Sequence, residues 1–533
     1  MKSVRIAALV WTALAIAAAC SSCDWRVTRD PDVLADSLPA DPPTLNPILA
    51  TEVTAGAINK YVYESLLDLD NRTLEFKPKL ARRWEVSPDH LSYTFWLRGG
   101  VQWHDGEPFT VDDVIYSFER IRDPKVDAAP LRNYFRDVKR IEKVGNDAVR
   151  FLYARPYFRA LEMLGGMTII PRHVFGDGAD FNSHMAGREP IGTGPFRFAG
   201  WKTGREIRLE RFDGYWGDAP AFKGIVYRII PDQMSAFQLL KKGALDIGSL
   251  RAIQWVRQTE SPAFGEKFAK HRYFLPNCSF IGWNMGRPLF SDRRVRIAMT
   301  MLVNRQEILK QALFGQGEVI AGDFYRFGPD YDASLQPYPY DPKEAARLLD
   351  EAGWIDHDDD GVRDHDGVPF RFTILSPAGG QLGRSLSLFL REELSKVGIV
   401  ADIQQLEWGT MLELIGRRDF DAAIFGRSMP LNHDPYQVWH STQVAEGSNF
   451  VGFKDKRADR LMEQARMEFD PKRRSAFYRE FQRIVQREEP YTFLFTNPSL
   501  VAVAKRFENV RDYRLGLDAL EWKVGPWPIL TEW

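Results

Sequence analysis

Apolar and polar residues alternate along this chain with two different periods. Residues 111–121 carry apolar side chains at helical spacing, and Thr110 and Asp113 open this stretch like a capping box. Further helical patterns cover residues 293–313, 342–352, 457–469 and 471–488, and strand patterns cover 92–97, 148–152, 207–211, 370–375, 421–425 and 492–495. Because the two kinds of pattern alternate, the sequence predicts an α/β protein.

The first 23 residues have the pattern of a secretory signal. Lys2 and Arg5 precede an uncharged, mostly apolar run over residues 6–19, which is too short to span a bilayer comfortably. Small residues lead from this run to Cys20 and Cys23, as in a lipoprotein signal. We therefore predict a signal peptide over residues 1–22, a lipid on Cys20 or Cys23, and a protein anchored to the membrane in the periplasm or cell envelope. The alternative is an ordinary cleaved signal that ends near cysteines.

Composition excludes several classes of protein. The chain has 533 residues, of which 44% are hydrophobic, so it can bury a large core. Its 71 basic and 72 acidic side chains nearly balance, whereas a nucleic-acid surface requires a basic excess. Three cysteines cannot form a disulfide framework, and Cys278 is expected to be a buried thiol. The sequence also contains no long Gly/Ser/Pro-rich linker, which favours lobes joined by crossing strands.

Two motifs could be mistaken for reactive sites. His104 to Glu107 contains acid and base side chains, but the Asp105-Gly106 pair is typical of a turn before the helix at Thr110. The glycines of residues 192–195 lack the Gly-Lys-Ser/Thr ending of a phosphate loop and are interpreted as a backbone bend. The sequence contains neither a His-Glu-x-x-His nor a Gly-x-Ser-x-Gly motif. It therefore predicts neither an enzyme nor a cofactor.

An acidic loop has the spacing of metal ligands. Asp356, Asp358 and Asp360 alternate before a glycine, like the first half of a calcium loop, and Asp364 follows. Gly367 stands where a calcium loop has its bidentate Glu. We interpret the segment as a solvated polar hairpin, with a structural calcium site as the alternative, and we commit to no metal.

An ordered set of segments carries a family resemblance. These segments are residues 43–47, 62–67, 80–89, 103–114, 192–196, 215–216, 242–246, 284 and 295–298. In this order and spacing they resemble the extracellular solute-binding proteins of family 5, the group of dipeptide- and oligopeptide-binding proteins of peptide/nickel ABC transporters. The resemblance implies the two-lobed type II periplasmic binding fold. Lobe I, discontinuous and subdivided, would span residues 24–275 and 495–533, and lobe II would span 276–494.

The resemblance also implies a function and partners. The protein would be a monomer that captures an oligopeptide-like solute between its lobes and delivers it to ABC permease and ATPase subunits. A non-peptide solute is one alternative, and a periplasmic sensor or chaperone on the same fold is another. An exported hydrolase is a further class, for which the sequence offers no motif.

Two strand edges are the expected ligand-binding surfaces, because an extended peptide can add to an exposed edge through main-chain hydrogen bonds. Carried over from the family, one edge falls on Thr51, Glu52 and Val53. The other follows the strand at residues 420–426 and falls on Gly426, Arg427 and Ser428.

The segment after this second edge departs from the family pattern. The family's peptide binders carry an Asp three or four residues before an acidic-Pro pair, and that Asp pairs with the ligand's free amino group. Here the pair is Asp434-Pro435, but the anchor position holds Pro430 or Leu431. Asp434 or Glu52 could substitute for the anchor, or the ligand could lack a free amino end. Trp439 follows and is expected to border the cleft, with packing between helix and lobe as the alternative.

Overall fold

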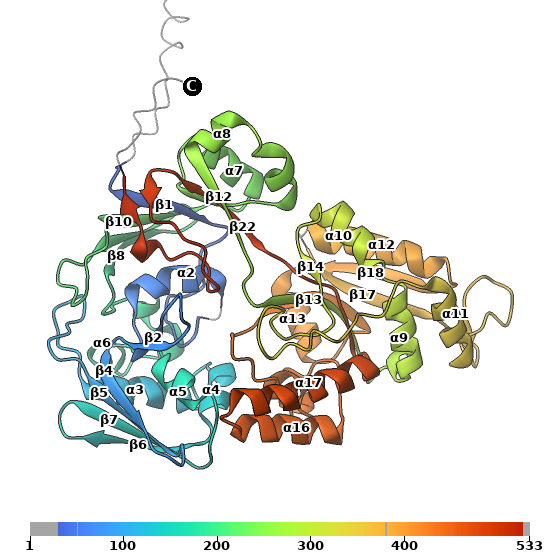
Figure 1. Cartoon of the computed structure of the whole chain (residues 1–533), viewed down its shortest axis with the longest axis horizontal. Helices are drawn as coiled ribbons and strands as arrows, with labels where there is room; N and C mark the ends of the chain where they lie inside the picture. The colour runs from blue at the N-terminus through green and yellow to red at the C-terminus, as the bar shows by residue number, and fades with distance from the viewer. Residues whose placement is uncertain (1–29, 51, 379–380, 526–533) are drawn as a thin grey trace, which may run out of the picture.

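A computed structural model describes residues 30–50, 52–378 and 381–525 of the protein. The chain forms two α/β lobes side by side (Figure 1). We call the first lobe the part whose buried apolar side chains come from residues 34–268 and 500–522. The second lobe is the part whose cores draw on residues 278–495. The two-lobed α/β prediction is confirmed.

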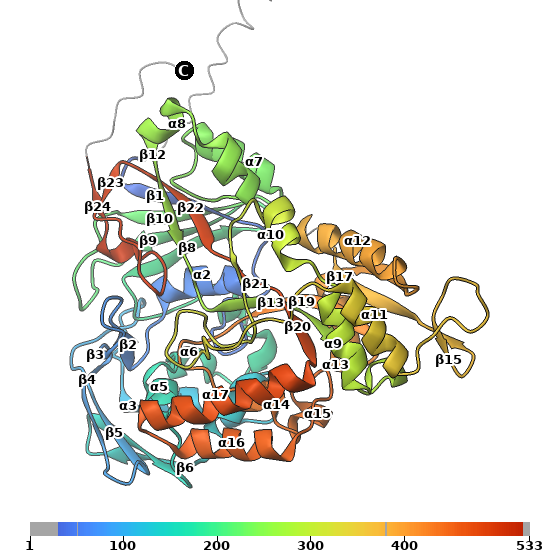
Figure 2. The same cartoon turned by 45° about the vertical axis from the view of Figure 1, so that its right-hand side comes forward.

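The first lobe contains three main sheets. One has the order β1-β10-β9-β8, a second β4-β5-β7-β6, and a third β11-β22-β12. Their strands are β1 (Val33–Leu38), β4 (Ala81–Val86), β5 (Ser92–Leu97), β6 (Val138–Val144), β7 (Ala148–Tyr153), β8 (Phe196–Lys202), β9 (Glu206–Arg211), β10 (Gly224–Ile229), β11 (Ile247–Ser249), β12 (Phe268–Tyr273) and β22 (Ser499–Ala504). Helix α2 (Val53–Val62) lies on the side of this lobe that faces the second lobe in both views (Figures 1 and 2).

The second lobe is built on one mixed sheet of order β18-β17-β19-β13-β20. Its strands are β13 (Asn277–Trp283), β17 (Arg371–Pro377), β18 (Val400–Leu406), β19 (Ala422–Ser428) and β20 (Tyr491–Phe493). One core packs helices α9 (Arg293–Met301), α10 (Arg305–Leu313), α11 (Pro342–Glu351) and α12 (Gln381–Ser395) against one face of the sheet. The other core packs α13 (Trp408–Gly416), α14 (Tyr436–Trp439), α16 (Lys456–Met467) and α17 (Pro471–Glu488) against the opposite face. Because successive side chains of a strand point to opposite faces of the sheet, neighbouring residues of a strand contribute to different cores.

The chain crosses between the lobes twice. It enters the second lobe between β12 and β13 and leaves it between β21 (Phe495–Thr496) and β22. Strand β22 pairs antiparallel with β11 and β12, and Arg506 binds the buried carboxylate of Asp246. These contacts support a return of the chain to the first lobe, while the boundaries at 275/276 and 494/495 stay a prediction.

Most predicted elements form where their end signals lie. Helix α3 (Val111–Arg122) begins with the Thr110 and Asp113 capping box. The side chains of Asp341 and Asp470 cap α11 and α17, each of which has proline in its first turn. The helical pattern over 293–313 is divided, because the side chain of Asn304 accepts a hydrogen bond from Glu307 and starts α10 anew.

The His104 motif and the glycine-rich segment 192–195 of the first lobe both take part in close packing. A Cβ at Gly192 or Gly194 would lie 1.8 or 2.3 Å from the backbone oxygens of Val62 and Tyr61, so only glycine permits this approach. His104 accepts a hydrogen bond from the Gly192 amide, and burial lowers its pKa to about 4. These contacts confirm the backbone bend at residues 192–195. Packing explains both this segment and the motif around His104.

Two further observations bear on the earlier predictions. Cys278 is buried, and burial raises the pKa of its thiol to about 12, so it is an inert core residue. Among the described residues, no helix is both long enough and apolar enough to cross a membrane. The predicted signal and the lipidation cysteines Cys20 and Cys23 lie outside the described residues.

Candidate functional site

Strand β19 has an open edge where it approaches its C-terminal end. Its seven residues pair with β13 along their whole length. On its other side it pairs with β17 only at Ala422 and Ala423. From residue 425 to residue 428, β19 has no strand partner on its β17 side within the part of the chain that the structure describes. The parallel strands β17, β18 and β19 end here together, which is where open α/β sheets bind ligands.

The register identifies which backbone groups face this edge. The amide of Met429 bonds the oxygen of Pro276, and the amide of Asn284 bonds the oxygen of Asp421. Because antiparallel ladders alternate, odd-numbered residues of β19 bond β13, and even-numbered residues point their N–H and C=O groups the other way. Gly426 and Ser428 are therefore the outward-facing residues, and both are exposed. This geometry suits the addition of an extended ligand.

Gly426 has a second reason to be glycine. A Cβ on it would lie 2.8 Å from the carbonyl oxygen of Cys278 in the neighbouring strand β13. A larger residue at 426 would thus disturb the pairing of β13 with β19, whatever the ligand does. Substitution of this glycine by valine reports on sheet packing and cannot serve as a clean test of ligand contact.

Arg427 lies between these two residues and belongs to a buried polar cluster. Its Nη2 is 3.2 Å from Asp323 Oδ2, and its guanidinium packs over the ring of Phe280. Trp439 Nε1 donates to the same Asp323 oxygen at 2.7 Å. Burial raises the pKa of Asp323, but Arg427, His433 and Trp439 together outweigh burial, so the pKa is lower than usual and the carboxylate is ionised.

Trp439 does not border a cleft in this structure. Its side chain is fully buried among the aromatic residues of the second-lobe core. The hydrogen bond to Asp323 satisfies its one polar group. The expectation that Trp439 contacts the ligand is therefore disfavoured by its burial, and the packing alternative describes the geometry better.

Asp434 is likewise occupied by protein partners. It is 4% exposed, and its Oδ2 accepts hydrogen bonds from Tyr157 Oη at 3.0 Å and pairs with Arg466 Nε at 3.2 Å. Its Oδ1 accepts from the amide of Tyr436. A substitute amino anchor would have to compete with Arg466 for this carboxylate, so the geometry also disfavours this expected role.

The first-lobe residues of the predicted site occupy the start of α2. Thr51 lies outside the described residues. Glu52 is the N-cap residue of the helix, and Val53 follows and is 86% exposed. The structure thus brings Gly426, Arg427 and Ser428 together on the second lobe, and it places Glu52 and Val53 on the first.

An apolar surface beside the open edge was not predicted from the sequence. Trp408 and Leu412 lie one turn apart on α13 and are 45% and 40% exposed. Helix α13 starts directly after β18, at the same ends of the parallel strands as Ser428. An aromatic residue directly after a strand was the available signal, but its exposure depends on the tertiary fold. These side chains are candidates for contact with the ligand's side chains.

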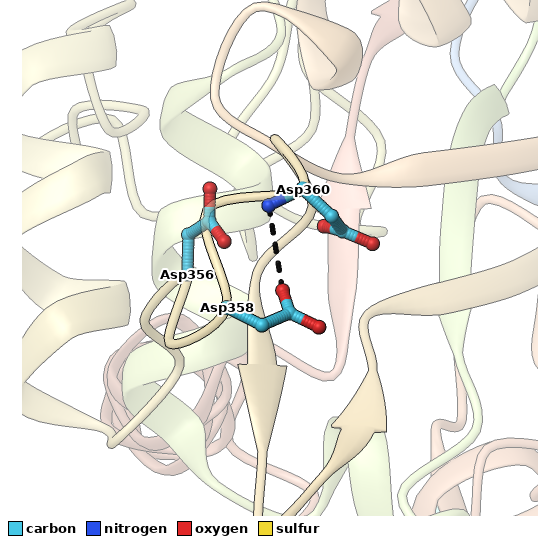
Figure 3. Close-up of side chains that lie close together, drawn as sticks. All are labelled: Asp356, Asp358 and Asp360. Carbon is cyan, nitrogen blue, oxygen red and sulfur yellow. Dashed lines mark hydrogen bonds between the residues drawn. The ribbon is translucent and has the colours of Figure 1, made fainter.

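The acidic loop forms a hairpin far from this edge in the second lobe. Oxygens of Asp356, Asp358 and Asp360 lie within 4.8 Å of one another (Figure 3). The fourth predicted residue, Asp364, instead accepts hydrogen bonds from the backbone and ring of His357, and the backbone bond contributes most to lowering its pKa. Three carboxylates on an exposed loop identify no ligand by themselves, so the polar hairpin remains our interpretation.

Comparisons with known proteins agree with this architecture. The profile of the bacterial extracellular solute-binding proteins, family 5, matches residues 75–449. The oligopeptide-binding protein AppA of Bacillus subtilis is 30% identical over 487 residues, covering 88% of this chain and 87% of AppA. The structure of AppA with a nonapeptide superposes with a TM-score of 0.83 at 28% identity, covering 92% of this chain and 99% of that chain. NikZ of Campylobacter jejuni with Ni(L-His) gives 0.82 at 25% identity, covering 93% and 100%.

Proposed function

Because the chain belongs to family 5 of the bacterial extracellular solute-binding proteins, we propose that it captures an extended, peptide-like solute between its lobes. It would act as a monomer and deliver the solute to the permease and ATPase subunits of an ABC transporter. The open edge of β19, with outward-facing groups on Gly426 and Ser428, carries this proposal. Main-chain bonds to such an edge tolerate many side chains.

The ligand's end near residues 430 and 431 is not a free ammonium in this proposal. Pro430 and Leu431 offer no charge there. Asp323 and Asp434 are both buried and paired with Arg427 and Arg466. A ligand ammonium buried here would lie beside two arginines and would have no carboxylate partner. Its burial would therefore cost free energy that no ion pair offsets. Longer or N-blocked peptides should therefore bind better than free dipeptides.

The main test identifies the ligand directly. Native mass spectrometry of the purified protein should show a co-purified peptide, because ligand held between two lobes is retained. A thermal-shift screen should then rank nonapeptides and N-acetylated dipeptides above free dipeptides, since a bound ligand raises the melting temperature. If free dipeptides gave the largest shifts, our interpretation of the missing anchor would be wrong.

A non-peptide solute is the second candidate. It is favoured by the absent amino anchor and by the fold similarity to NikZ, whose structure holds a nickel–histidine complex. Recovery of a co-purified small molecule, with no thermal shift from any peptide class, would favour this candidate over the first.

Lipid anchoring in the cell envelope is part of the proposal and rests on the sequence around Cys20 and Cys23. A palmitate analogue should label the wild-type protein during growth, and replacing both cysteines by serine should abolish the label. Single replacements would identify the modified cysteine. Labelling that survives the double replacement would exclude a lipid at either position.

A further inference from the structure

The two lobes also touch at a seam remote from the chain crossings. In both views α16 and α17 lie at the bottom of the second lobe against the first lobe, whereas the crossings near β13 and β22 lie above them (Figures 1 and 2). The amide of Phe158, from the first lobe, donates to the oxygen of Arg466 at the end of α16. His90 stacks on Phe469 with 3.6 Å between ring centroids.

One buried polar group lies at the centre of this seam. Tyr157 belongs to the first-lobe core and is 2% exposed, and its Oη donates to Asp434 Oδ2 across the lobe boundary. Arg466 pairs with the same oxygen and packs over the ring of Tyr157 at 4.8 Å. Burial raises the pKa of Tyr157 well above 10, so its hydroxyl keeps the proton that it donates.

The surrounding bonds complete the seam. Asn133 donates to Gln437 at 2.7 Å, and Asn432 donates to Glu162 at 3.1 Å, each across the boundary. They are more exposed than the Tyr157 bond, so water can replace them at little cost. The central bond is different, because opening the seam leaves the Asp434–Arg466 pair to be hydrated and exposes the ring of Tyr157.

We propose that Tyr157, Asp434 and Arg466 are positioning residues that hold the lobes together opposite the chain crossings and thereby set how long the cleft stays closed. This assignment builds on the proposed function and gives Asp434 a role other than amino anchor. Since the three residues contact each other and not the open edge of β19, they would act on closure of the cleft and leave the ligand's own contacts intact.

The experiment measures the distance between the lobes. In the full chain with Cys20→Ser and Cys23→Ser, spin labels are placed through Lys139→Cys and Lys472→Cys, two exposed positions on either side of the seam. Electron–electron double resonance then reports the ratio of open to closed molecules, without ligand and with an N-acetylated random nonapeptide pool. Buried Cys278 is protected from labelling.

Tyr157→Phe should raise the open-to-closed ratio about tenfold, because it removes only the hydroxyl that bonds a charged acceptor. Tyr436→Phe is the matched control: its ring also lies under Arg466, at 4.5 Å, but among the described residues its hydroxyl hydrogen-bonds only Thr442, in its own lobe. The control should leave the ratio unchanged. Asp434→Asn gives a second variant if Tyr157→Phe lowers the melting temperature strongly, and it should also favour the open form.

An unchanged ratio in Tyr157→Phe and Asp434→Asn would overturn the assignment, and so would an equal rise in Tyr436→Phe. The ligand-free measurement is independent of solute identity. If the nonapeptide pool never closes the wild-type protein while the two variants still open it, the peptide proposal fails and the seam assignment stands.

Discussion

Ser428 is the residue at which strand addition can be tested without disturbing the sheet. Its N–H and C=O groups face away from β13, so a proline here removes one outward donor and leaves the β13 ladder intact. The preceding residue, Arg427, already lies in an extended strand, which is the conformation that a following proline requires. Ser428→Pro therefore deletes one predicted ligand hydrogen bond at small structural cost.

The expected magnitude follows from burial of the ligand. A ligand carbonyl that loses its donor inside the cleft is left unsatisfied, which costs about 1 to 3 kcal/mol, or roughly 5- to 150-fold in Kd. Ser428→Ala keeps the N–H group and should bind within about twofold of wild type. Isothermal titration with the co-purified peptide, or with an N-acetylated nonapeptide pool, measures both variants.

A third variant separates ligand effects from sheet effects. Arg427→Pro removes an amide that bonds β13 and also the guanidinium that pairs with buried Asp323, so it should lower the melting temperature, whereas Ser428→Pro should not. The reasoning is refuted if folded Ser428→Pro binds the nonapeptides as tightly as Ser428→Ala. In that case the ligand does not add to this edge of β19.

The remaining predictions concern stability and its dependence on pH. Asp246→Asn should lower the unfolding free energy by about 3 to 5 kcal/mol in urea titrations, because it removes the negative charge that pairs bidentately with the buried guanidinium of Arg506. Asp147→Asn, which opens an exposed pair, should cost less than about 1 kcal/mol, and equal effects would contradict the argument. Burial raises the pKa of Glu489 to about 8, from 4.5 in the unfolded chain, so the folded state holds a proton that the unfolded state releases. Stability should therefore fall as pH rises from about 5 to 8. In melting-temperature measurements over this range, Glu489→Gln should show a smaller fall than wild type. An equally steep fall in the variant would show that another group is responsible.

Much of the fold could be predicted because its helices carry local signals. Thr110, Asp341 and Asp470 mark helix starts by their own side chains, and each caps a helix in the structure. Helices α12 and α13 were missed. Helix α13 begins at Trp408 with two large apolar residues that stay exposed, so its pattern does not separate a buried face from a solvent face.

The candidate site could be predicted only in part, since its main feature is a tertiary property. Whether Gly426 and Ser428 offer an open edge depends on where β17 diverges from β19, and their own sequence does not encode this. The contact between Tyr157 and Asp434 joins residues 277 positions apart, so no local pattern could reveal it. The resemblance pointed to the strand that has the open edge, but the partner of each side chain required the structure.

The acidic-Pro pair at residues 434–435 therefore has a structural role at the seam between the lobes. Pro430 is exposed, whereas Asp434 is buried and turned toward Arg466 and the first lobe. In the function that we propose, the ligand has no charged end to be recognised, and discrimination comes from backbone bonds and from the apolar surface at Trp408 and Leu412. Without recognition of the ligand's end, the cleft makes fewer contacts with the ligand. A stable closed form offsets this loss of affinity, because each closed molecule holds its ligand for longer. A buried seam between the lobes fits a binding protein that selects its solutes by length and backbone more than by a free amino end.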